Sequence, residues 1–78
     1  MHTYFVRFAC STPTTVRPRT ISYLMGSSSR ESLRKRVKEL AKANGAYLIE
    51  IYTEKGRMND EKPIEEWMLG ENRWERIR

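Results

Sequence analysis

The sequence is poor in the residues on which most catalytic and metal sites depend. Its 78 residues include a single histidine, His2, and a single cysteine, Cys10. A histidine-assisted nucleophile or a zinc site needs several such side chains, so neither can be assembled. The glycine patterns of the common phosphate-binding loops are also absent. We therefore predict a non-enzymatic protein with no catalytic residue, no metal ligand, no cofactor and no small-molecule substrate.

Long apolar runs are missing as well. No stretch approaches the roughly 18 apolar residues that indicate a transmembrane helix, and the first residues lack the basic and apolar pattern of a secretory signal. A lone thiol cannot form an internal disulfide, and such cysteine usage is typical of a reducing compartment. We expect a cytoplasmic protein that does not bind membranes.

What the sequence does contain is the composition of a small folded protein. Apolar residues make up 38% and charged residues 32% of the chain, proportions that are typical of a globular domain. No repeat or low-complexity tract divides it, so we predict a single small domain over residues 1–78. A chain of this length buries only about 60% of its unfolded surface, so association with a second copy would be a natural source of stability.

The clearest local signal is a helix from Ser28 to Gly45. Ser28 and Glu31 have the spacing of a capping box, and Asn44-Gly45 supplies a left-handed helix end. Between these signals the apolar residues recur at helical spacing and form one stripe. The stripe consists of Leu33, Val37, Leu40 and Ala41.

Residues 3–10, 20–25 and 47–53 alternate apolar and polar positions as strands do. Short connections on both sides of the helix make the second and third strands parallel, in a right-handed crossover. We expect the apolar first strand between them, in the order 2-1-3, and a basic loop over residues 11–19. These elements predict an α+β fold: a ββαβ core with a three- to four-stranded mixed sheet and one long helix packed on one face.

The C-terminal part of the sequence predicts a short helix. Pro63 suits a first helical turn, Ile64, Trp67 and Met68 follow at helical spacing, and Gly70 ends the pattern. Residues 73–78 fit either a fourth strand or a frayed tail.

Charge is the most function-like property of the sequence. The net charge is +5, and from Arg17 to Lys42 eight basic residues stand against two acidic ones. Clustered cations attract nucleic acid, because each neutralised phosphate releases condensed counterions. The predicted DNA or RNA contacts are Arg17 and Arg19 in the loop, and Arg34, Lys35, Lys38 and Lys42 on the helix.

The helical part of this surface has an ordinary explanation too. Arg34, Lys38 and Lys42 form a row that we expect on the side facing away from the apolar stripe. Glu31 and Glu39 flank Lys35 at the spacing of stabilising helix pairs. A solvent-facing helix shows the same pattern. Whether Arg17 and Arg19 extend the row therefore decides between a nucleic-acid-binding surface and an ordinary charged helix.

The alternative function is protein interaction, with a partner protein or as a homodimer. The sheet face away from the helix is predicted to carry much apolar area, which is seldom left bare. Either the C-terminal segment covers this face or another molecule does. The predicted interaction residues are Phe5, Leu24, Leu48, Tyr52, Trp67 and Trp74.

A third hypothesis is a small enzyme that uses the acidic residues near the C-terminal helix. These residues are Asp60, Glu61, Glu65 and Glu66. They lack the ligand spacing of a calcium loop, and acids are common in a first helical turn, so the hypothesis is disfavoured.

Overall fold

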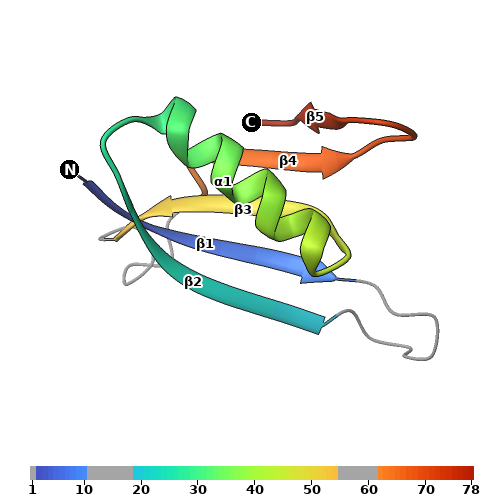
Figure 1. Cartoon of the computed structure of the whole chain (residues 1–78), viewed down its shortest axis with the longest axis horizontal. Coiled ribbons are helices and arrows are strands. Elements are labelled where there is room, and N and C mark those ends of the chain that lie inside the picture. Colours follow the sequence, from blue (N-terminus) through green and yellow to red (C-terminus); the bar gives the residue numbers. More distant parts are fainter. Residues whose placement is uncertain (1, 11–18, 55–61) are drawn as a thin grey trace.

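The computed structural model describes residues 2–10, 19–54 and 62–78. Its elements are β1 (His2–Cys10), β2 (Arg19–Ser27), α1 (Arg30–Ala43), β3 (Ala46–Thr53), β4 (Glu65–Leu69) and β5 (Trp74–Arg76). The strands form one sheet in the order β2-β1-β3-β4-β5, and α1 lies across one face of it (Figure 1). This is an α+β architecture. In the described part of the chain, no helix has the length and apolar content needed to cross a membrane.

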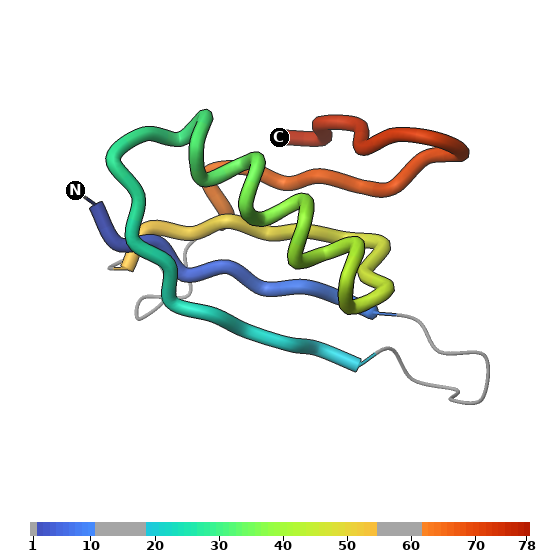
Figure 2. Tube along the Cα trace, in the orientation of Figure 1, coloured from blue at the N-terminus to red at the C-terminus, as the bar shows by residue number. Residues whose placement is uncertain are grey.

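The sheet confirms the predicted order of the first three strands. β1 lies between β2 and β3 and is antiparallel to both, so β2 and β3 run in the same direction. The predicted mixed sheet is wrong, because the two parallel strands are separated by β1 and every neighbouring pair is antiparallel. The trace in Figure 2 shows the chain leaving β2, passing through α1 and returning as β3 on the other side of β1.

The core lies between α1 and the helix-facing side of the sheet. Alternate strand residues share one face, so the register brings one set of β1 and β3 side chains under the helix. The apolar stripe of α1 is confirmed: Leu33, Val37 and Ala41 are buried, and Leu40 packs against the core from its edge. The buried strand residues of this core are Tyr4, Val6, Phe8, Cys10, Met25, Ala46, Ile49 and Ile51.

The helix begins one residue later than predicted. Ser29 is the N-cap, and its hydroxyl accepts a hydrogen bond from the Ser32 amide at 3.2 Å. The predicted capping box at Ser28 is therefore wrong. The Ser27 hydroxyl donates to the Ser29 carbonyl at 2.8 Å, which fixes how the chain enters the helix. The other end is confirmed, because Gly45 has a φ of 66° after the cap residue Asn44.

The predicted C-terminal helix is also wrong, because its residues form β4. Glu65 pairs with Ile51 and Met68 with Leu48, so β4 uses the free edge of β3. An isolated helical turn is unstable in water, whereas a strand edge offers a full set of backbone partners. β5 then returns along β4, which fits the strand alternative for the last residues. The C-terminal segment thus widens the sheet to five strands and does not cover its second face.

Candidate functional site

The basic row of α1 faces the C-terminal strands. Arg34 bonds to Glu65, the Lys38 ammonium lies 4.2 Å from the centroid of the Trp67 ring, and Lys42 shares a pocket with Trp74. The row is offset by one residue from the buried stripe, so a turn of about 100° brings it to the flank of the helix above β4 and β5. The expectation that it points away from the core is wrong.

An ion pair between Arg34 and Glu65 fixes the helix to β4. The Glu65 side chain has no exposed surface. Arg34 donates from Nε to Oε1 at 2.8 Å and from Nη2 to Oε2 at 2.9 Å, and Trp67 Nε1 donates to Oε1 at 3.0 Å. A two-pronged pair of this kind is the strongest form of the interaction. Arg34 is thus engaged within the fold.

The surroundings of Glu65 also fix its charge. Burial alone would raise the pKa of Glu65, but the hydrogen bonds from Arg34 and Trp67 outweigh it and lower the pKa below its ordinary value. The Glu65 hydrogen bond likewise outweighs partial burial and raises the pKa of Arg34. Both partners are therefore ionised at neutral pH, and the buried carboxylate is compensated.

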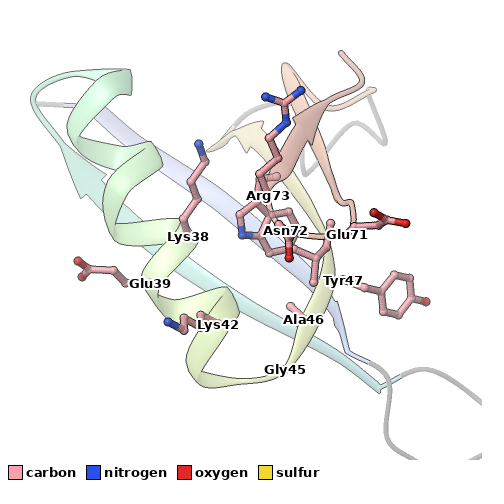
Figure 3. A pocket seen from close by; sticks show the side chains of 11 residues that line it. Lys38, Glu39, Lys42, Gly45, Ala46, Tyr47, Glu71, Asn72 and Arg73 are labelled. Atoms are coloured by element: carbon pink, nitrogen blue, oxygen red, sulfur yellow. The ribbon is translucent and has the colours of Figure 1, made fainter.

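A pocket of about 660 Å³ lies between the second half of α1 and the β4–β5 hairpin, and we call it the α1–β5 groove. In Figure 3, Lys38 and Arg73 extend in the same direction from the helix and the hairpin, whereas Glu39 and Glu71 point away on either side. The groove is lined by Lys38, Glu39, Lys42, Gly45, Ala46, Tyr47, Leu69, Glu71, Asn72, Arg73 and Trp74. It combines apolar and aromatic surface with three cations, Lys38, Lys42 and Arg73.

Two of the other predicted nucleic-acid contacts, Arg19 and Lys35, do not join this groove. Arg19 is exposed at the start of β2, the strand at the opposite edge of the sheet from β5. It therefore does not extend the helical row. Lys35 is exposed on α1 and is absent from the groove lining. Arg17 lies outside the described residues.

The predicted protein-interaction residues divide between the two faces of the sheet. The register places Phe5, Leu24, Leu48 and Tyr52 together on the face away from α1. Trp67 and Trp74 lie with the core on the helix side. Leu24 is 58% exposed, whereas Tyr52 is buried.

Tyr52 is held in a polar network on that second face. Arg7 Nη2 donates to the Tyr52 hydroxyl at 3.0 Å, and the hydroxyl donates to Glu50 at 2.9 Å. Arg7 also forms an ion pair with Glu50 at 2.9 Å. Burial and the negative charge of Glu50 raise the pKa of Tyr52. The face is therefore part apolar and part ionic, and the sequence analysis missed its ionic part.

The acidic cluster of the third hypothesis is not assembled in the described region. Asp60 and Glu61 lie outside the described residues. Glu65 and Glu66 are neighbours in a strand and point to opposite faces. Among residues 2–10, 19–54 and 62–78, no group of three or more His, Cys, Asp or Glu side chains could hold a metal ion.

Sequence reasoning missed Arg73 and the structural role of Glu65. Arg73 directly precedes Trp74, and a cation beside an aromatic residue is a usable signal for binding to nucleic acid. The Arg34–Glu65 pair joins residues 31 positions apart, and no local pattern indicates it. Finding it requires knowing that β4 lies beside the helix.

Comparisons with protein-family models, with curated protein sequences and with solved structures found no match.

Proposed function

We propose that the protein is a non-catalytic module that binds single-stranded nucleic acid in the α1–β5 groove. The observation that carries the proposal is the presence of Lys38 and Arg73 beside an apolar pocket that includes Trp74. Cations attract phosphates, and the flat face of a base stacks on an aromatic side chain. The groove offers both kinds of contact.

The charges around the groove support an anionic ligand. Three cations, Lys38, Lys42 and Arg73, line it against two acids, Glu39 and Glu71, whose side chains point away on either side in Figure 3. The whole chain also carries a net charge of +5. Together these charges favour the approach of a polyanion and predict binding that weakens as salt is added.

The intramolecular bonds of Arg34, one of the three cations in the helical row, favour a single strand over a duplex as the ligand. Duplex binding along α1 would need a run of free cations facing the phosphate backbone. Arg34, the first residue of the row, is bonded to Glu65 through Nε and Nη2, so the row does not offer such a run. Stacking on Trp74 also needs an unpaired base, because the bases of a duplex already stack on each other.

Fluorescence anisotropy with a labelled single-stranded oligonucleotide tests the proposal. Arg73→Ala should weaken binding and reduce the salt dependence by roughly the 0.7 expected for one lost phosphate contact. Trp74→Leu should weaken binding about 5- to 150-fold, the effect of losing about 1–3 kcal/mol of base stacking.

Lys35→Ala is the matched control. It removes the same charge from α1 at an exposed position outside the groove. We expect it to leave affinity within about twofold, as for a cation that makes no phosphate contact. Absence of wild-type binding at low salt would contradict the proposal. If Lys35→Ala and Arg73→Ala lowered the affinity equally, the binding would be non-specific charge attraction and the groove would not be the site.

A specific observation favours a second function, binding of a protein partner to the sheet face away from α1. Leu24 is 58% exposed and Met68 is 48% exposed. Leu24 pairs with Phe5 and Met68 with Leu48, so these four apolar side chains belong to one face. The folded protein should then bind an apolar dye, and Leu24→Lys with Met68→Lys should abolish that binding. A folded wild-type protein that binds no dye would count against this function.

A further inference from the structure

β2 presents a long open edge. It contains nine residues and pairs along its whole length with β1, from Arg19 opposite Cys10 to Ser27 opposite His2. No described strand lies on its outer side. Alternate residues of such a strand direct their N–H and C=O groups away from the sheet, which makes the edge a template for another strand. At its end the Gly26 carbonyl accepts a hydrogen bond from Arg36 at 2.7 Å.

The two edges of the sheet differ in how they are protected. β5 has only three residues, and two of them, Glu75 and Arg76, are charged and exposed. Short length and charge are the usual means of preventing edge pairing. β2 carries one charge, Arg19 at its first residue, and contains no proline. Its pairing with β1 has no register shift that would twist the edge away.

We propose that β2 pairs antiparallel with β2 of a second copy of the chain. The two copies would form a continuous ten-stranded sheet about a two-fold axis perpendicular to it. Pairing over the full nine residues centres on Tyr23. In this register Ile21 lies opposite Met25 of the second copy, and Ser22 lies opposite Leu24.

The sequence of β2 is complementary to itself in this register. Ile21, Tyr23 and Met25 lie on the helix side, where Ile21 and Tyr23 are partly buried at the border of the core. Pairing would extend that core across the junction. Arg19 would face Ser27 of the second copy, so no like charges oppose each other across the strands.

This dimer is independent of the proposed nucleic-acid function. The perpendicular axis leaves both copies of α1 on the same face of the ten-stranded sheet. Each α1–β5 groove lies beside β5, at the far edge from the junction. Dimerisation through β2 therefore leaves both grooves open.

Sedimentation equilibrium of the full chain over a range of concentrations tests the proposal. We expect a concentration-dependent species of twice the chain mass of 9.3 kDa. Ser22→Lys with Leu24→Lys places like charges opposite each other twice across the junction, and should weaken the dimer about tenfold or more. Both positions are exposed in the single chain, so the variant should keep its fold.

Two further variants make the test specific. Ser22→Lys with Leu24→Glu places opposite charges across the junction and should dimerise more tightly than the double lysine variant. Met68→Lys adds a charge to the same sheet face on β4, away from the junction, and should leave the dimer unchanged. A monomer at all concentrations would overturn the proposal, as would a dimer that the double lysine variant leaves intact. Loss of the dimer in Met68→Lys would instead indicate stacking of sheet faces and would overturn edge pairing.

Discussion

Replacing Arg34 with methionine should lower the free energy of unfolding by about 3 kcal/mol. Methionine keeps the apolar volume of the side chain but removes the two hydrogen bonds to Glu65, which has no exposed surface. Breaking a buried pair by removing one partner costs about 3–5 kcal/mol, because the other charge stays buried. The lower end of this range applies, because Arg34 is 30% exposed and because Arg30, 3.9 Å from Glu65, still compensates part of the carboxylate charge.

A double-mutant cycle separates the ion pair from the packing around it. Arg34→Met and Glu65→Met should each destabilise the protein, whereas the combined variant should lie within about 1–2 kcal/mol of wild type because no unpaired charge remains. Urea unfolding followed by far-UV circular dichroism gives the free energy of unfolding of the wild type, the two single variants and the double variant. A cost below about 1 kcal/mol for Arg34→Met, the range of an exposed pair, would refute the reasoning.

The same pair predicts a pH dependence. The folded protein lowers the pKa of Glu65 from its ordinary value of 4.5, so folding favours the charged carboxylate. Its contribution to stability is present above pH 4.5 and is lost as the pH falls through the lower pKa of the folded state. Glu65→Gln should lose less stability than wild type over that acid range. Parallel stability curves for the two proteins would contradict the assignment.

The remaining predictions concern single residues. Ser29→Ala should cost about 1 kcal/mol because it removes the helix cap, whereas Ser28→Ala should cost clearly less in the same urea assay; equal costs would contradict the cap assignment. Gly45→Ala should cost about 1 kcal/mol, because the φ of 66° disfavours a side chain even though nothing lies within 4 Å of the added Cβ. The buried Cys10 thiol should react with a thiol reagent only as fast as the protein opens; immediate reaction would contradict its burial.

β4 shows why a five-residue segment can be misassigned. Ile64, Trp67 and Met68 have helical spacing, whereas residues 65–69 are two glutamates followed by three apolar residues and show no apolar–polar alternation. The local sequence therefore favours a helix, although the pattern is too short to exclude a strand. The choice depends on the free edge of β3, which supplies backbone partners to a strand. That edge exists only once β3 is in the sheet.

The sequence alone determined the parts of the protein whose signals are local. The stripe of α1 and its glycine end follow from residues within a few positions of one another, because a helix satisfies its own backbone. The central place of β1 follows from its apolar composition and the short connections of the helix.

Only the tertiary structure decided what the charged residues do. The sequence placed Arg34, Lys38 and Lys42 in one row and treated them as equivalent cations. In the fold, one is locked to a buried glutamate, one lies over an indole ring, and one lines a groove with Trp74. The difference arises from β4 and β5 beside the helix, and such long-range neighbours leave no trace in local spacing.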